Sequence, residues 1–382
     1  MKENIPERVI VFIIDGLHWQ APNLLRMPVF NQLVDQGTYI PQSHMILPHH
    51  PTVGEYGRIH SSSFPNPVLQ EGTLFIHPDN KMLQEVFPAG RQTAFLANTK
   101  AYMSVTRGFN LVIQEPAFTD QDIVMAGIDL IHKQDPVYTR IHLQTAGNEG
   151  RYLSYGDPFE TYYRNIYGQG SPYAATVETA DKLLGEFIKA LKDMGKWSTT
   201  LLVVTSDHGQ SLQGWHPIID EDSMMTPLLF YGPSIAKGRL LPYFEHTDLS
   251  ATITGLMHLP QPNTDGGSGQ FIREVLEDQP AEGYTHPEFI RTINQQLNKY
   301  NALRARIMIA GEKDVYFSSL ISYLENELLT PEPFYHQDRF LEWSRAGSTQ
   351  HLIDSNSKIL QQMENELKKV ASIFPDLLNT RP

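Results

Sequence analysis

A run of apolar, mostly β-branched residues ends abruptly in metal-type side chains near the middle of the chain. Residues 201–209 read Leu-Leu-Val-Val-Thr-Ser-Asp-His-Gly, and residues 9–16 repeat the pattern as Val-Ile-Val-Phe-Ile-Ile-Asp-Gly. Such runs are typical of parallel strands that are buried on both faces. Ligands of open α/β sheets bind outside the carboxyl ends of the strands. Asp15, Asp207 and His208 are therefore predicted to meet at one edge of a parallel sheet.

Length and charge narrow the class of protein. A chain of 382 residues allows one large α/β domain with insertions or two domains. The net charge of −13 argues against nucleic acid as a partner, because phosphate backbones are bound mainly by Lys and Arg. Since the chain has no cysteine, any metal must be held by His, Asp, Glu, hydroxyl or amide groups.

The N-terminal segment predicts neither secretion nor membrane insertion. Residues 1–8 are polar, and the apolar run that follows has only six residues before Asp15. A signal peptide has an apolar region of roughly 7–15 residues, and a membrane span needs about 20. The expectation is a cytoplasmic protein without a membrane partner.

Hydrophobic periodicity predicts alternating helices and strands. The helix predicted at 176–194 leads directly into the strand at 201–205, which is the unit of a parallel sheet. Segments 44–67 and 144–173, rich in glycine with proline or tyrosine, are predicted to be loops. The other predicted helices are 23–36, 123–132 and 249–257, and the other strands are 9–14, 93–97, 110–113, 137–143 and 228–231.

The character of the chain changes after about residue 280. Residues 289–309 and 338–370 have mainly helical patterns. We therefore expect an α/β domain over residues 1–280 and a mainly helical C-terminal extension over residues 281–382. The extension is either an appendage or an oligomerisation arm, through which the chain would form a homo-oligomer.

Three landmarks in the order seen here resemble the alkaline phosphatase superfamily, over about residues 9–275. The first is the strand that ends in Asp-Gly, and the second is Leu-Pro-His-His-Pro-Thr followed by Phe-Pro. The third is Thr-Ser-Asp-His-Gly, then Gly-Trp-His and Pro-Leu-Leu-Phe-Tyr-Gly-Pro. They occupy residues 15–16, 47–52, 64–65, 205–209, 214–216 and 227–233. The resemblance implies an α/β fold with a mostly parallel, alkaline-phosphatase-like sheet and helices on both faces.

The resemblance implies that Thr52 is a metal-activated nucleophile. Metal coordination makes an alkoxide from a hydroxyl that is otherwise a poor nucleophile. Asp15, Asp207 and His208 would hold the ion together with Thr52. Oxygen and imidazole donors without thiolate favour zinc, with manganese as the alternative. In the competing interpretation Thr52 and Asp15 cap helices, and Asp207 and His208 lie in an ordinary loop.

A second metal site departs from the pattern of phosphodiesterase-like relatives. His216 matches the later histidine of that site, but the expected acid is Gln144 or Thr145 and the expected histidine is Asn148. Neutral amides bind a second divalent ion less well than carboxylate and imidazole. One ion is expected, and the second site is empty, weak or replaced by polar contacts to substrate. Compensating ligands are sought among Asp220, Glu221, Asp222 and His246.

Residues around Thr52 bear on the substrate. Sulfatases of this superfamily carry a Cys or Ser that becomes formylglycine, which a threonine cannot form, so a conventional sulfatase is disfavoured. Glu55 stands where phosphodiesterase relatives often have Asn, and its charge would repel a phosphate dianion. The candidate substrate-binding residues are Glu55, Arg58, Lys100, Gln144 and Asn148, with His60 as a further candidate.

The sequence therefore predicts a metal-dependent hydrolase of phosphoric or related esters. Thr52 would form a covalent threonyl intermediate with a small-molecule ester. Two alternatives remain open at this stage. One is a phosphotransferase or mutase on the same scaffold, and the other is a degenerate relative that binds a ligand without catalysis.

Overall fold

The structure is a computed structural model. It describes residues 5–45, 67–70, 73–76, 81–101, 105–217, 220–262, 269–311, 319 and 349–373. The predictions made for Thr52, Glu55, Arg58 and His60 lie outside the described residues. Among the described helices, none combines the length and the apolar character that a membrane crossing requires.

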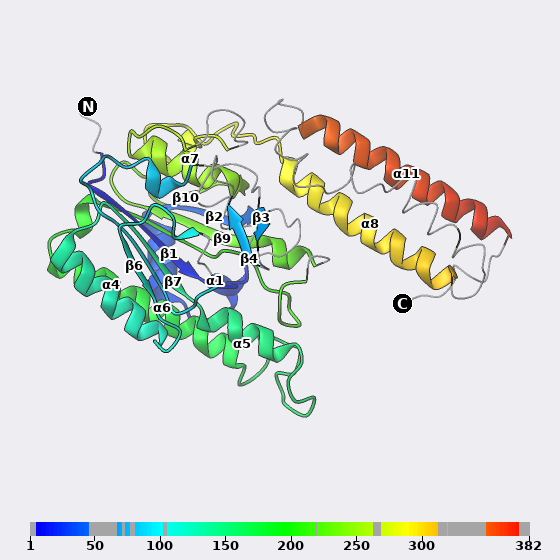
Figure 1. Cartoon of the computed structure of the whole chain (residues 1–382), viewed down its shortest axis with the longest axis horizontal. Coiled ribbons are helices and arrows are strands. Elements are labelled where there is room, and N and C mark those ends of the chain that lie inside the picture. Colours follow the sequence, from blue (N-terminus) through cyan, green and yellow to red (C-terminus); the bar gives the residue numbers. More distant parts are fainter. Residues whose placement is uncertain are drawn as a thin grey trace.

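A nine-stranded sheet forms the centre of the molecule, with the order β10-β2-β9-β8-β1-β7-β5-β6 and with β11 beside β2 (Figure 1). Strand β9 runs antiparallel to β2 and β8, and the other pairings of this sheet are parallel. The strands are β1 Arg8–Ile14, β2 Thr38–His44, β5 Thr93–Ala97, β6 Leu111–Gln114, β7 Tyr138–Leu143, β8 Thr200–Thr205, β9 Met225–Tyr231, β10 Arg239–Leu240 and β11 Phe244–Glu245. The predicted fold class, a mostly parallel α/β sheet, is confirmed.

The two strands read first from the sequence lie side by side at the centre. Every residue of β1, β7 and β8 is buried, which explains the nearly continuous apolar runs of β1 and β8. Strand β1 pairs Ile13 with Thr205 of β8 and Ile14 with Leu143 of β7. The carboxyl ends of these three strands are therefore level, and the residues that follow them share one edge of the sheet.

Helices cover both faces of the sheet (Figure 1). Helices α2, α4 and α6 share a core with Ile10, Phe12 and Ile14 of β1, whereas α7 packs with Val9, Val11 and Ile13 on the other face. The helices of this body are α1 Ala21–Leu24, α2 Pro28–Gln36, α4 Asp120–Gln134, α5 Thr145–Leu153, α6 Pro172–Asp193 and α7 Thr247–Leu256. Short 3₁₀ turns are η1 Leu83–Glu85, η3 Trp197–Thr199, η4 Glu221–Met224 and η5 Arg273–Val275.

Two predicted elements were wrong in part. The helix expected at 23–36 is broken into α1 and α2, because Pro28 begins a new helix at its first turn. The loop expected at 144–173 contains α5, whose Gly147 and Gly150 weakened the helical pattern. Strand β2 and the separate pair β3 Pro67–Gln70 and β4 Thr73–Ile76 had not been predicted.

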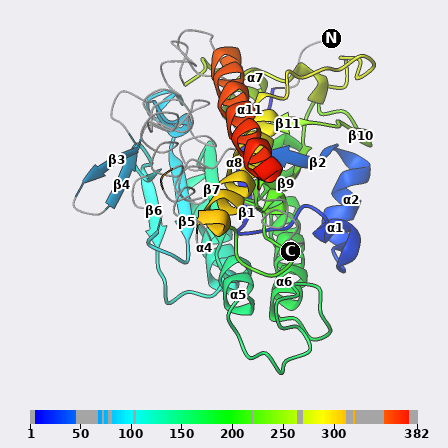
Figure 2. The ribbon, with the colours of Figure 1, turned by 90° about the vertical axis from the view of Figure 1, so that its right-hand side faces the viewer.

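The C-terminal helices form a hairpin that projects from the α/β body (Figure 1). Figure 2 views the molecule along this hairpin. Helices α8 Phe289–Gly311 and α11 Thr349–Ile373 pack through a buried apolar stripe that includes Leu297 and Met363. Between them Asn356 donates a 2.9 Å hydrogen bond to the Gln296 side chain. The helical character predicted for this part of the chain is confirmed where the structure describes it.

Candidate metal centre at the carboxyl edge of the sheet

Three predicted metal ligands converge directly after β1 and β8. Asp15, Asp207 and His208 are each 2% exposed or less. His208 Nε2 lies 3.4 Å from Asp207 Oδ2 and 3.8 Å from Asp15 Oδ1. We call these three residues the sheet-edge cluster. The strand register brings them together, as the sequence predicted from the two apolar runs.

The hydrogen bonds of His208 prepare its ring for a ligand. Its Nδ1 lies 2.8 Å from the carbonyl oxygen of Gly209, so Nδ1 carries a proton and donates a hydrogen bond to that oxygen. In the neutral ring Nε2 then keeps its lone pair, which faces the two carboxylates. Histidines that bind metals commonly donate their other ring N–H in this way.

Hydrogen bonds join the turn after β1 to the turn after β8. Ser206 Oγ accepts a 2.9 Å hydrogen bond from the Leu17 amide and donates a 2.7 Å bond to the His208 carbonyl. The Gly16 amide donates to Asp207 Oδ1 at 3.4 Å, from a left-handed backbone with φ of +62° that favours glycine. These bonds join the two turns and hold the Asp207 carboxylate.

The start of α5 packs directly against Asp15. A methyl group on Gly147 would overlap the Asp15 carboxylate, so only glycine allows this approach. The Gln144 side chain forms a hydrogen bond to Asp15. Gln144, predicted to contact substrate, thus lies beside a proposed ligand, whereas Asn148 is exposed on the first turn of α5. Lys100 is exposed just beyond the end of β5.

His216 joins the cluster from a separate loop. Its ring meets the His208 ring edge-on with centroids 4.3 Å apart, and it stacks on Trp215 at 3.9 Å. Trp215 has a strained φ of +65°, and its amide donates to the Gly150 carbonyl at 3.0 Å. The Arg151 guanidinium lies 4.8 Å from the Trp215 ring. The loop is therefore tied to α5, and it directs His216 toward the cluster.

Two residues of β7 were missed by the sequence reasoning. His142 Nε2 lies 3.1 Å from Asp15 Oδ2, and Arg140 Nη2 lies 3.3 Å from His142 Nδ1. Both side chains are fully buried. Burial lowers the pKa of His142 to about 3, so its ring is neutral at pH 7. The available signal was two ionisable residues, two positions apart, on a strand buried on both faces.

The donors of this site suit a divalent cation. Burial raises the pKa of Asp15 from 3.8 to about 6, although the His208 and Arg140 charges and the Gln144 hydrogen bond act to lower it. Ligand atoms of Asp15, His142 and Asp207 all lie within 4.8 Å of one another. Carboxylate oxygen and imidazole nitrogen together match zinc or manganese chemistry. The residues present therefore fit a divalent metal, which Asp15, Asp207 and His208 would hold, with His216 adjacent.

The predicted compensating ligands have other contacts. Asp222 accepts a 2.8 Å hydrogen bond from the Trp19 indole and lies 3.6 Å from His18 Nε2. His246 occupies the cap position of α7, and its Nε2 lies 2.8 Å from Thr226 Oγ1. In the part of the chain that the structure describes, Asp222 therefore contacts residues of the turn after β1, and His246 contacts β9.

A second group of metal-type residues lies where the hairpin meets the body. This junction cluster consists of Glu245, Asp248 and His286. His286 Nε2 lies 2.9 Å from Asp248 Oδ2, and Glu245 Oε1 accepts bonds from the Tyr243 hydroxyl and the Ile290 amide, both at 2.9 Å. Asp248 Oδ1 accepts from the Gln270 amide at 2.9 Å. Because these donors already occupy the carboxylates, the cluster ties α8 to the body.

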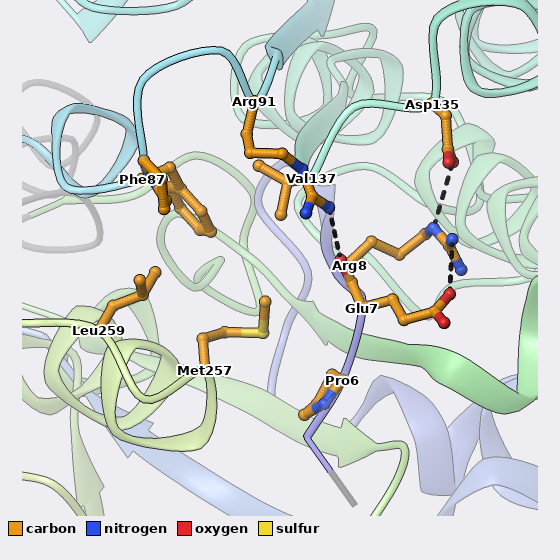
Figure 3. A pocket seen from close by; sticks show the side chains of 10 residues that line it. Pro6, Glu7, Arg8, Phe87, Arg91, Asp135, Val137, Met257 and Leu259 are labelled. Carbon is orange, nitrogen blue, oxygen red and sulfur yellow. Dashed lines mark hydrogen bonds and ion pairs between the residues drawn. The ribbon is translucent and has the colours of Figure 1, made fainter.

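A hollow of about 380 Å³ lies at the opposite end of the sheet, beside the start of β1 (Figure 3). Its charged groups are paired with one another. Arg8 contacts Glu7 at 3.2 Å and Asp135 at 3.4 Å, and Arg91 donates to the Glu7 carbonyl. This hollow therefore contains none of the candidate metal ligands, and it lies away from the edge where ligands of α/β sheets bind.

Comparison with known proteins supports the interpretation of this edge. A family model described as Sulfatase matches residues 75–259. Arylsulfatase K of Danio rerio is 37% identical over 110 residues, which are 27% of this chain and 20% of the relative. Arylsulfatase K of Bos taurus is 33% identical over 151 residues, 35% of this chain and 28% of the relative. The chain therefore spans less than a third of the length of these curated relatives.

Solved structures share the fold at low identity. The phosphonate monoester hydrolase of Agrobacterium radiobacter has a TM-score of 0.59 at 14% identity, over 73% of this chain and 79% of that chain. Human ectonucleotide pyrophosphatase/phosphodiesterase 5 has a TM-score of 0.56 at 14% identity, over 71% and 100%. A protein solved with its substrate D-glucosamine-2-N,6-O-disulfate has a TM-score of 0.58 at 15% identity, over 74% and 84%.

The described part of the chain has an alkaline-phosphatase-like α/β fold, with candidate metal ligands at the carboxyl edge of its sheet. The predicted resemblance is borne out at the level of the fold, which sulfatase, phosphodiesterase and phosphonate monoester hydrolase structures share, and by the Sulfatase family model over residues 75–259. One curated relative, 26% identical over 106 residues, is an inner membrane protein of Salmonella typhimurium. The cytoplasmic location expected from the sequence stays a prediction.

Proposed function

We propose that this chain is a metal-dependent hydrolase of small phosphoric or related esters, with Thr52 as nucleophile. The observation that carries the proposal is the convergence of Asp15, Asp207 and His208 at the carboxyl edge of the sheet. His216 extends this donor set from a neighbouring loop. Zinc is the metal we propose, with manganese as the alternative.

In the proposed reaction the Thr52 oxygen attacks the phosphorus atom, and the bond to the alcohol breaks. Water then cleaves the threonyl ester and releases the acid, which regenerates the hydroxyl. A bound divalent cation supplies a lowered pKa for the hydroxyl and compensates charge on the transferring group. The protein residues contribute position, because Asp207 is held by the Gly16 amide, His208 by the Gly209 carbonyl and Asp15 by His142.

A sulfuric ester is the second candidate substrate class. The matching family model is described as Sulfatase, and three of the curated relatives are arylsulfatases of the K type. The threonine at position 52 favours phosphorus, since it lacks the formylglycine precursor expected of a sulfatase. Both ester classes belong to the same superfamily, so substrate profiling has to separate them.

The test compares three chromogenic substrates: 4-nitrophenyl phosphate, bis(4-nitrophenyl) phosphate and 4-nitrocatechol sulfate. The purified chain, supplied with Zn²⁺ or Mn²⁺, should hydrolyse at least one phosphorus ester faster than the sulfate. Thr52→Ala should lower kcat at least about 1,000-fold, since nucleophile loss removes the covalent route. Thr179→Ala, an exposed threonine on α6, is the matched control and should keep full activity.

Three outcomes would contradict the proposal. Full activity of Thr52→Ala would exclude the threonyl intermediate. Preferred turnover of the sulfate would assign the second substrate class. Absence of Zn²⁺ and Mn²⁺ binding by calorimetry would favour a degenerate binding relative. Labelled water separates hydrolase from transferase, because only a hydrolase places solvent oxygen in the released acid.

A further inference from the structure

Two ionisable side chains stand where a buried parallel strand normally carries apolar residues. Arg140 and His142 lie on the same face of β7 and are 0% exposed. Burying a guanidinium is expensive unless its hydrogen bonds are used. Thr139 and Ile141 alternate to the other face of the strand, where Ile141 belongs to the core shared with α4 and α6. A packing role alone does not explain both polar side chains.

The contacts of Arg140 determine which nitrogen of His142 carries the proton. A guanidinium can only donate, so His142 Nδ1 must accept the bond from Arg140 Nη2 at 3.3 Å. The proton of the neutral ring is therefore on Nε2, which lies 3.1 Å from Asp15 Oδ2. His142 donates to Asp15. Its Nε2 has no lone pair to give to a metal in this tautomer.

The two oxygens of the Asp15 carboxylate have different partners. Oδ2 accepts the bond from His142, whereas Oδ1 faces His208 Nε2 at 3.8 Å. Gly147 packs against the same carboxylate and restricts its rotation. Oδ2 is thus held by His142, and Oδ1 is directed toward His208 Nε2.

We infer that His142, with its tautomer fixed by Arg140, is a positioning residue that orients Asp15 toward a bound divalent cation. The inference rests on the proposed metal-dependent function and adds to it a hydrogen-bond relay from Arg140 to His142 to Asp15. Such a relay holds the carboxylate in the geometry for coordination. It also excludes His142 itself from the ligand set.

The experiment measures metal binding to the full chain, with Co²⁺ as a spectroscopic probe. Calorimetry gives the dissociation constant, and the visible absorption bands report the donor atoms around Co²⁺. His142→Ala should weaken binding about 10–100-fold, as loss of an outer hydrogen-bond partner typically does. His142→Gln, whose amide nitrogen reaches a similar position and still donates, should recover most of that loss. Arg140→Met, which frees the tautomer, should give an intermediate loss.

Thr139→Val is the matched control, because Thr139 is equally buried on the same strand but points to the opposite face. It should bind Co²⁺ as the wild type does. Circular dichroism confirms that each variant is folded. The Co²⁺ bands of His142→Gln should match those of the wild type, because the relay leaves the donor atoms unchanged.

The inference is overturned if His142→Ala binds Co²⁺ with wild-type affinity, or if Thr139→Val loses as much affinity. Shifted Co²⁺ bands in His142→Gln would make His142 a ligand, which also overturns the positioning role. A wild-type chain that binds no metal would sink the proposed function itself. Wild-type binding and turnover with an unaffected His142→Ala would remove only the relay.

Discussion

The sheet-edge cluster and the junction cluster have the same composition but different surroundings. Each brings two buried carboxylates and a histidine together. At the junction, backbone amides, Tyr243 and His286 donate to the carboxylates. At the sheet edge Asp15 accepts from His142 and Asp207 from the Gly16 amide, and His208 directs its Nε2 at both acids, 3.4 Å from Asp207 and 3.8 Å from Asp15.

The difference teaches that residue type alone does not identify a metal site. Saturated carboxylates gain little from a cation, because a cation would have to displace good hydrogen bonds. Two carboxylates that converge with an imidazole nitrogen gain more from a cation, since one cation compensates both negative charges at once. The direction of each N–H therefore separates a structural clamp from a candidate metal centre.

The largest expected effect comes from removing one carboxylate at each cluster. Asp207→Asn should weaken Zn²⁺ or Mn²⁺ binding by more than about 100-fold, which exceeds the usual cost of losing an outer partner. Asp248→Asn should leave metal affinity unchanged. It should lower the free energy of unfolding by about 1.5–3 kcal/mol, because a charged buried hydrogen bond to His286 is lost.

Calorimetry with metal and chemical denaturation without metal measure the two quantities on the same preparations. The comparison breaks down if Asp248→Asn loses metal affinity as strongly as Asp207→Asn does. It also breaks down if Asp207→Asn destabilises the metal-free protein more than Asp248→Asn.

A smaller effect on affinity is expected from Gly147→Ala. The added methyl group overlaps Asp15 Oδ1 and must displace the carboxylate, so metal affinity should fall about 10–100-fold. Alanine is the better helix former by about 1 kcal/mol, so helix propensity cannot explain such a loss. Asn148→Ala, exposed on the same turn of α5, is the control and should bind normally. Wild-type affinity in Gly147→Ala would show that Asp15 is not held as described.

The smallest effect concerns pH dependence at the junction cluster. Burial and the Asp248 charge raise the pKa of Glu245 from 4.5 to about 7. The pKa of His286 is also raised: burial would lower it, but the hydrogen bond to Asp248 more than offsets that. In both cases the folded state binds the proton more tightly. The stabilisation is full below the unfolded pKa and is lost as pH rises through the folded one.

Between about pH 5 and pH 8 the chain should therefore lose on the order of 1–3 kcal/mol of stability from this cluster. Glu245→Gln, neutral at every pH, should flatten that loss, because its amide oxygen still accepts from Tyr243 and Ile290. Glu282→Gln, which changes an exposed carboxylate close in sequence to His286, should keep the wild-type dependence of stability on pH. Equal slopes in wild type and Glu245→Gln would place the pH dependence elsewhere.

The sequence was sufficient for the strands that carry the sheet-edge cluster. Strands β1 and β8 are buried on both faces, so their apolar runs are unbroken and their ends are sharp. Strand β2 was missed because it contains Pro41 and polar residues, and its register to β9 is irregular between Ile40 and Ser43. A strand with such a mixed pattern is recognisable only from its pairing.

The supporting residues of the site could not be predicted, for a different reason. His142 and Arg140 lie inside a strand, where the sequence pattern gives their face but not their partner. Helix α5 was hidden because Gly147 and Gly150 lower helix propensity, yet the structure needs glycine at 147 to approach Asp15. Ligands follow from motifs, whereas the contacts that orient them follow from three-dimensional packing.

Hydrogen bonds at the root of the hairpin tie it to segments that neighbour the candidate metal centre in the sequence. At its root Asn294 donates to the Met45 carbonyl at 2.7 Å, and the Met45 amide donates to the Met224 carbonyl of η4 at 3.0 Å. Met45 directly precedes the segment that contains Thr52, and η4 follows the loop of His216. With 23 residues, α8 is about 35 Å long, so a 5° tilt at the root moves its far end by about 3 Å. Conversely, a force applied at the far end of the hairpin would act on the residues at its root through the full length of α8.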